Sequence, residues 1–132
     1  MSKTNPTDRK YSREHEWARP HDDGTATIGI TDHAQELLTD IVFVELPAPG
    51  RRVRRGEAVA VVESVKSVSD VFSPLSGEVV AVNRALEDRP ELINQDAWGE
   101  GWIAKLKLAD PTEYDDLMDA AAYDAFIRDE AH

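Results

Sequence analysis

A repeated strand pattern is the feature of this sequence that most restricts its fold. Residues 56–61 read Gly-Glu-Ala-Val-Ala-Val and residues 77–82 read Gly-Glu-Val-Val-Ala-Val, so five of the six positions agree. Each copy begins with a turn-forming glycine and continues into β-branched residues, which is typical of a turn followed by a strand. Two copies are too few for a repeat array. We therefore expect a small β-sandwich built from two related halves.

Further strands and a few short helices are predicted around this repeat. Strands are predicted by β-branched or alternating residues over residues 25–30, 41–46 and 103–108. Asp32, followed three residues later by Gln35, predicts a capped helix over residues 33–39. Thr112 predicts the cap of a helix over residues 113–120. A last helix is expected over residues 122–129, and residues 92–102 are expected to form a loop.

The length of the chain suits one domain. We expect residues 11–132 to form it, and residues 1–10, which are polar, to be a flexible tail. No apolar run approaches the roughly 20 residues that a membrane span needs. The first ten residues have neither the apolar core of a signal peptide nor the arginine-rich character of a transit peptide. These features predict a cytoplasmic protein that does not bind membranes.

The charge of the chain excludes several classes of partner. The net charge of -11 argues against nucleic acid and anionic membranes. The one basic cluster, residues 51–55, is interpreted as a solvated edge strand, with a docking patch as the alternative.

The absence of cysteine excludes disulfides, thiolate nucleophiles and cysteine-based zinc sites. The histidines show no metal-ligand spacing on one helix, and no catalytic triad or phosphate-binding glycine loop stands out, which favours a carrier over an enzyme.

The segment between the two copies places a lysine at the tip of a predicted hairpin. Residues 61–72 are two apolar strands that flank a short tip containing Lys66. A two-residue hairpin favours Asn-Gly or Asp-Gly, but this tip has Val65-Lys66-Ser67. A turn that is poor for folding is expected where function constrains the sequence. An exposed lysine can be acylated by an enzyme, although an ordinary surface lysine would look the same in isolation.

Several segments, in the same order, resemble motifs of the H-protein family of the glycine cleavage system. The most specific is residues 63–70, Glu-Ser-Val-Lys-Ser-Val-Ser-Asp, followed by Ser-Pro-Leu-Ser-Gly-Glu-Val at residues 73–79. The other motifs are His-Glu-Trp at 15–17, Ile-Gly-Ile-Thr-Asp-His-Ala at 28–34, Val-Glu-Leu-Pro at 44–47, Pro-Glu-Leu-Ile-Asn at 90–94 and Gly-Glu-Gly-Trp at 99–102. The resemblance covers about residues 11–125.

The resemblance implies an all-β fold, a barrel-sandwich hybrid of antiparallel strands with short peripheral helices, including C-terminal helices. It also implies a non-catalytic, monomeric carrier with lipoate attached covalently to Lys66. The lipoyl arm would take the aminomethyl group of glycine from the pyridoxal-phosphate-dependent glycine decarboxylase (P protein) to the tetrahydrofolate-dependent aminomethyltransferase (T protein). Dihydrolipoyl dehydrogenase (L protein) and a lipoate-attaching enzyme would be the other partners.

The resemblance also implies roles for four further residues. Glu63 and Gly77 would help the lipoate-attaching enzyme to recognise the hairpin. Glu16 and Asp70 would line a cleft that shelters the loaded arm and would hydrogen-bond to its amine. The sequence departs from the family at Glu14, where serine is frequent, and at residues 97–98, where Ala-Trp replaces Pro-Tyr.

Four other interpretations of the lysine hairpin are considered from the sequence. A lipoyl domain of a 2-oxoacid dehydrogenase complex would be shorter and would lack the extra terminal regions. A biotin carrier would place methionines beside the lysine, where this chain has Val65 and Ser67. A lipoyl relay protein would hand lipoate to other complexes. A β-sandwich binding module would leave Lys66 unmodified.

Overall fold

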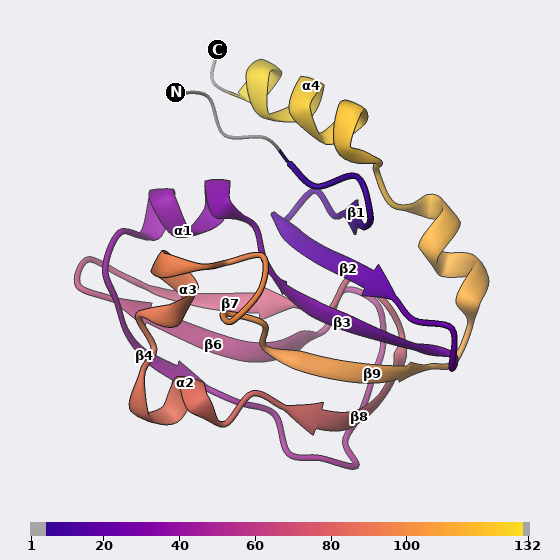
Figure 1. Cartoon of the computed structure of the whole chain (residues 1–132), viewed down its shortest axis with the longest axis horizontal. Helices are drawn as coiled ribbons and strands as arrows, with labels where there is room; N and C mark the ends of the chain where they lie inside the picture. The colour runs from indigo at the N-terminus through magenta and orange to yellow at the C-terminus, as the bar shows by residue number, and fades with distance from the viewer. Residues whose placement is uncertain (1–4, 131–132) are drawn as a thin grey trace.

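Two antiparallel sheets form the body of the protein (Figure 1). The structure is a computed structural model and describes residues 5–130. The larger sheet has the order β1 (Lys10–Tyr11), β2 (Glu16–Pro20), β3 (Thr25–Ile30), β9 (Ala104–Leu108), β8 (Gly77–Val82) and β5 (Arg52–Val53). The smaller sheet has the order β4 (Ile41–Glu45), β6 (Ala58–Ser64) and β7 (Val68–Phe72). The predicted all-β, antiparallel architecture is therefore confirmed.

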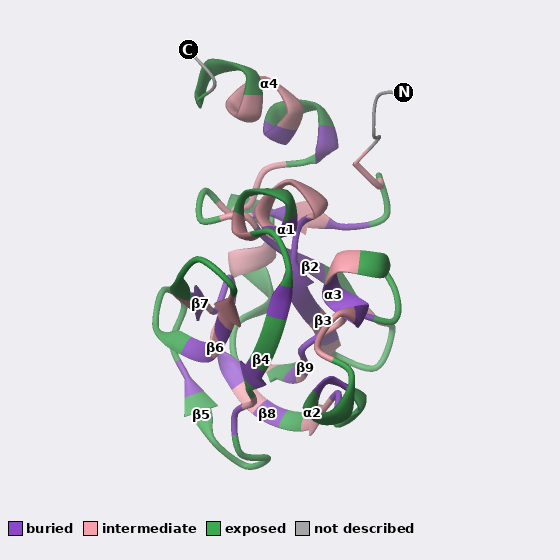
Figure 2. Ribbon diagram, turned by 90° about the vertical axis from the view of Figure 1, so that its left-hand side faces the viewer, coloured by how far each residue is buried: buried purple, intermediate pink, exposed green. Residues whose placement is uncertain are grey.

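The two copies of the repeat lie in different sheets. The first copy leads into β6 at the centre of the smaller sheet, and the second forms β8 in the larger sheet. Val59 and Val62 of β6 and Val79 of β8 are all buried in one hydrophobic cluster. Figure 2 shows that most of the buried residues lie in the strands, whereas exposed residues occur on the connections, the helices and β4. The repeat therefore supplies both walls of the sandwich with core side chains.

Short helices surround the sandwich, and some of them begin at residues other than those predicted. They are α1 (Asp32–Leu38), α2 (Ala85–Asp88), α3 (Leu92–Gln95), the 3-10 helix η1 (Pro111–Asp116) and α4 (Ala120–Glu130). The side chain of Thr31, and not that of Asp32, caps α1 by accepting a hydrogen bond from the backbone N–H of Ala34 at 3.1 Å. Asp110, and not Thr112, caps η1, because its carboxylate accepts from the N–H of Thr112 and Pro111 follows at the first helical position.

The C-terminal helical prediction was partly wrong in type and extent. Residues 113–120 were expected to form one helix, but η1 ends at Asp116 and α4 already begins at Ala120. The segment 92–102, expected to be a loop, contains α3 because Leu92 and Ile93 are buried in the core. Among the described residues, no helix is long and apolar enough to cross a bilayer.

The N-terminal segment makes more contacts than a loose tail would make. Arg9 is buried, its guanidinium lies 4.5 Å from the ring centroid of Trp17, and it donates a 2.9 Å hydrogen bond to the carbonyl of Trp98. Lys10 is the first residue of β1. The expected boundary at residue 11 therefore falls within a strand, because cation–π and hydrogen-bond contacts hold Arg9 on the domain. Residues 1–4 lie outside the described residues.

The basic cluster includes a strand at the edge of the larger sheet. Strand β5 is last in the strand order and pairs only with β8 among the described strands. The Arg55 guanidinium binds the carboxylate of Asp116 at 2.9 Å, and Arg51 donates to the carbonyl of Ala58. The interpretation of this cluster as an edge strand is confirmed for residues 52–53, and the docking patch stays an untested alternative.

The connection between α1 and β4 supports the end of the β6–β7 hairpin. Asn94 accepts a hydrogen bond from the N–H of Ile41 at 2.9 Å and donates to the carbonyl of Thr39 at 2.8 Å. Between these two residues, the carbonyl of Asp40 accepts a 3.0 Å hydrogen bond from the N–H of Val65. The hairpin tip is thus attached to a fixed part of the fold.

Candidate functional site

Lys66 lies at the tip of the β6–β7 hairpin, as predicted. The last strand pair joins Glu63 to Val68, which leaves residues 64–67 as the tip. The Ser64 hydroxyl accepts hydrogen bonds from the N–H groups of Lys66 and Ser67 at 3.3 and 3.1 Å. The N–H of Ser64 donates to the carbonyl of Ser67 at 2.8 Å. Ser64 therefore supplies the turn chemistry that asparagine and glycine would supply in a shorter hairpin.

The side chain of Lys66 is exposed at this tip. Among the described residues, its ammonium group makes no ion pair or hydrogen bond. Val65 and Val68, on either side, are each 67% exposed. A fixed backbone thus presents a free amine, which is the arrangement that an acylating enzyme and a covalently attached acyl group require.

A cleft of about 140 Å³ lies between the hairpin, α1 and the start of β2. Glu14, Glu16 and Asp70 supply its acidic side chains. Its remaining lining residues are His15, Ile30, Ala34, Leu37, Leu38, Val62, Ser69 and Val71. Glu16 and Asp70, which were predicted to act together, therefore line the same cleft, and Glu14 adds a third carboxylate at the position where the family often has serine.

Glu16 is the most strongly perturbed acid in this cleft. Its side chain is buried, accepts a hydrogen bond from the Ser12 hydroxyl, and accepts another from the N–H of Phe72 at 3.2 Å. Burial raises its pKa to about 7, although the hydrogen bonds from Ser12 and Phe72 oppose this shift. Protonated and ionised forms of Glu16 are therefore both populated near neutral pH.

The sequence does not predict the hydrogen-bonding partners of Glu16. Phe72 is 56 residues away in the chain. Ser12 approaches through a tight turn, in which the N–H of His15 donates to the carbonyl of Ser12 at 3.2 Å. No periodic signal marks either contact, so only the three-dimensional fold reveals them.

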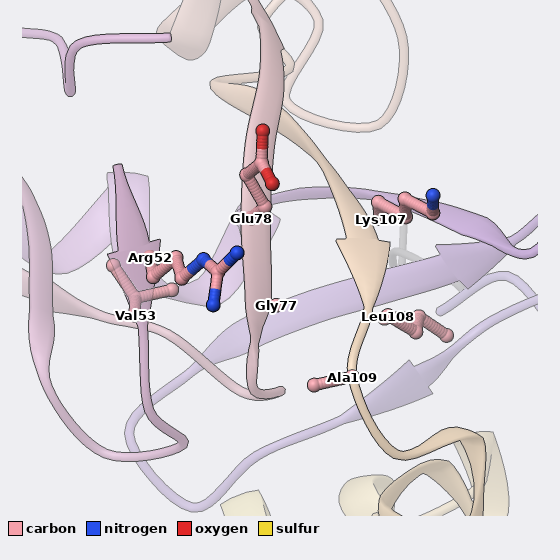
Figure 3. A pocket seen from close by; sticks show the side chains of 7 residues that line it. All are labelled: Arg52, Val53, Gly77, Glu78, Lys107, Leu108 and Ala109. Atoms are coloured by element: carbon pink, nitrogen blue, oxygen red, sulfur yellow. The ribbon is translucent and has the colours of Figure 1, made fainter. Parts of the chain in front are cut away.

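Glu63 and Gly77 occupy different parts of the molecule. Glu63 is partly exposed on β6, opposite Val68 and next to the tip. Gly77 begins β8 in the other sheet, between β5 and β9, and borders a shallow pocket of about 300 Å³ (Figure 3). A Cβ atom at position 77 would collide with the backbone carbonyl oxygen of Lys107. Close approach of the two strands therefore requires glycine there.

Comparisons with known proteins agree with this geometry. A family model described as "Glycine cleavage H-protein" matches residues 9–130. The chain is 57% identical over 125 residues to the glycine cleavage system H protein of Shewanella putrefaciens, covering 95% of this chain and 97% of that protein. It is 56% identical to the same protein of Cronobacter sakazakii, with the same coverage.

A solved structure gives the same result. The crystal structure of a glycine cleavage system H protein from Mycobacterium marinum superposes with a TM-score of 0.84 at 37% sequence identity, covering 97% of this chain and all of that chain. The chain belongs to the glycine cleavage H-protein family. As an H protein it is a carrier subunit and not a catalyst. Similarity over nearly the full length does not favour the alternatives of a lipoyl relay or a 2-oxoacid dehydrogenase lipoyl domain.

The perturbed pKa of Glu16 predicts an unusual pH dependence of stability for this H protein. Because its folded-state pKa of about 7 exceeds its ordinary value of 4.5, the unfolded chain releases this proton first as the pH rises. The stabilising effect of the bound proton is therefore complete at low pH and is lost between about pH 4.5 and 7. Compared with Glu16→Gln, the unaltered chain should lose on the order of 3 kcal/mol of unfolding free energy across that range.

Urea unfolding of both proteins between pH 4 and 8 measures this difference. Glu45→Gln, an exposed position on β4, serves as the control and should show the pH dependence of the unaltered chain. A constant difference between the unaltered chain and Glu16→Gln across this pH range would show that Glu16 titrates normally.

Proposed function

We propose that Lys66 carries a lipoyl group in amide linkage, and that this H protein uses it to move the aminomethyl group of glycine from the P protein to the T protein. The observation that carries the proposal is the free, exposed amine of Lys66 on a tip whose backbone is fixed by Ser64 and Asp40. When bound, lipoate supplies a disulfide and dithiol that carry the group, and the L protein reoxidises the dithiol. The contribution of the chain is the position of the amine and the surface around it.

The lysine side chain and the lipoyl chain together set the reach of the arm from the hairpin tip. Bond lengths along the lysine stem and the lipoyl chain add up to roughly 14 Å. A tether of this length converts encounters between the carried group and an enzyme bound at the hairpin end into an intramolecular step at high effective concentration. A fixed tip and a mobile side chain suit this role, because the tip defines the centre of the volume that the arm samples.

Exposed apolar side chains near the tip support contact with partner enzymes. Most of the large exposed hydrophobic residues described belong to α1, β4 or the tip end of the β6–β7 hairpin, namely Leu37, Val42, Phe43, Val65 and Val68. Phe43 pairs with Glu63, and Leu37 lines the cleft beside Asp70. Exposed apolar surface of this kind is typical of a binding face. The P, T and L proteins and the lipoate-attaching enzyme are the partners that we assign to it.

The adjoining cleft would receive the loaded end of the arm. Glu16 and Asp70 offer oxygen atoms that can accept hydrogen bonds from an amine, and the apolar residues of the cleft would shield the arm from water. Ionised Glu16 would attract a cationic amine, and its pKa near 7 means that little free energy is needed to ionise it.

The cytoplasmic location and the monomeric state of the protein remain predictions.

We assign recognition by the lipoate-attaching enzyme to Glu63 directly and to Gly77 indirectly. Glu63 presents a carboxylate beside the tip, whereas Gly77 allows β8 to approach β9 and so supports the sandwich behind the hairpin. Glu63→Gln should slow lipoate transfer about tenfold, the effect of losing one charge-assisted hydrogen bond. Intact-mass analysis during the transfer reaction measures this rate. Glu45→Gln should react like the unaltered chain, and an equal rate for Glu63→Gln would remove Glu63 from the recognition site.

Reconstitution tests the proposed carrier role. Lipoylated chain mixed with the P, T and L proteins, tetrahydrofolate and the nicotinamide oxidant of the L protein should support release of labelled carbon dioxide from glycine. Lys66→Arg keeps the charge but cannot form the amide at this position, so turnover should fall to background. Lys107→Arg, at an exposed lysine in the other sheet, should remain fully active.

The outcome also separates two carrier roles. If the lipoylated, unaltered chain fails to support glycine decarboxylation, the glycine cleavage role is wrong, and a lipoyl relay role would explain the attached group better. If Lys66→Arg supports normal turnover, the assignment of the attachment site is wrong.

A further inference from the structure

Two histidines and a glutamate from distant parts of the chain meet outside the proposed lipoyl site. His15 precedes β2, His33 lies in the first turn of α1, and Glu130 is the last residue of α4. The Nε2 atom of His15 is 3.0 Å from a carboxylate oxygen of Glu130, and the Nε2 atom of His33 is 3.8 Å from the same oxygen. One possible ligand atom from each residue lies within 4.8 Å of the others. We propose that these three residues bind a divalent transition-metal ion of the zinc type.

The distances are close to those that such an ion requires. Zinc bonds of about 2.0–2.1 Å to nitrogen and oxygen, arranged tetrahedrally, place neighbouring ligand atoms roughly 3.3 Å apart. The two distances from the Glu130 oxygen lie on either side of that value. The Glu130 side chain is 43% exposed, so a small rotation of its carboxylate can admit the ion.

The ligand types select the class of ion. Two imidazole nitrogens and one carboxylate oxygen suit zinc and its transition-metal neighbours, whereas magnesium and calcium prefer sets of oxygen ligands. Three protein ligands leave a fourth tetrahedral position for water. Because the Glu130 side chain is exposed, the site would be accessible to an ion from solution.

The outer contacts of His15 orient its ring for this task. Its Nδ1 atom lies 2.7 Å from the hydroxyl of Tyr123, which lies 2.7 Å from the hydroxyl of Thr31. Tyr123 and Thr31 are both fully buried. The hydrogen bond at Nδ1 holds the ring with Nε2 directed at Glu130, and Nε2 could bind a metal placed between the two residues, as in many histidine ligands. The backbone of His15 has a φ of 67°, an uncommon conformation for a residue other than glycine.

A bound ion would join three separate elements. Both views of the molecule place α4 on the same side as α1, above the sheets (Figures 1 and 2). The ion would tie the end of α4 to α1 and to the turn before β2. His15 also lines the cleft that contains Glu16, so the ion would stabilise one wall of the cleft. This inference does not depend on lipoylation of Lys66.

Calorimetric titration of the full, metal-free chain with zinc tests the proposal. We expect one ion per chain and a rise in the thermal unfolding midpoint, because binding to the folded state stabilises it. His33→Ala should weaken zinc binding on the order of tenfold or more. It should still fold, because His33 makes only a 3.8 Å contact with Glu130 among the contacts described for its ring nitrogens. His21→Ala, which removes a histidine bonded to Thr27 outside the cluster, should bind zinc like the unaltered chain.

Two further measurements make the result specific. Glu130→Gln should weaken zinc binding as His33→Ala does, with an unchanged circular dichroism spectrum. Cobalt added in place of zinc should give the visible absorption of a tetrahedral complex in the unaltered chain, and this absorption should be lost in His33→Ala. Equal zinc affinity for the unaltered chain and His33→Ala, or no binding at all, would overturn the proposal and leave the cluster as a polar contact that holds α4.

Discussion

The burial of strand β6 is the constraint on which the site depends. This strand pairs with both β4 and β7 and directs Val59, Ala60 and Val62 into the core shared with the larger sheet. An irregularity in its pairing with β7 near Ala60 allows two consecutive residues to be buried. A slip of one residue would expose these side chains. The register of the hairpin is therefore fixed, and Lys66 is placed at its tip as a consequence.

The same region combines a fixed backbone with a free side chain. Hydrogen bonds from Val65 to Asp40 and from the tip to Ser64 hold the peptide groups in place. Asn94 fixes the α1–β4 connection from behind. A carrier needs both a fixed backbone and a free side chain, because the attachment point of the arm must stay in place while the arm itself moves. The cleft around Glu16 lies within the same assembly of elements and adds a buried acid whose protonation changes near neutral pH.

The sequence predicted the features that depend on local pattern. The repeat and the β-branched segments predicted the strands, and the poor turn around Lys66 marked the hairpin tip. Glu16 and Asp70 were placed together only through the resemblance to the family. The caps of α1 and η1 were assigned to the wrong residues, because Thr31 and Asp32, like Asp110 and Thr112, are both good capping types and only geometry decides between them.

Features that depend on long-range contacts could not be predicted. Arg9 was assigned to a tail because nothing in the polar segment indicates that Trp17 and Trp98 will lie beside it. No metal site was expected, because the histidines lack ligand spacing on one helix. The proposed site draws its ligands from three separate elements. His15 and Glu130 are 115 residues apart and meet only in the folded chain.

Peptide mapping by mass spectrometry tests the central claim most directly. The unaltered chain and Lys66→Arg would be produced in cells that attach lipoate, digested, and searched for a lipoyl adduct on every lysine. The account predicts one adduct, on the peptide that contains Lys66, and none in Lys66→Arg. An adduct on another lysine, an adduct that persists in Lys66→Arg, or a chain that is never lipoylated would contradict it.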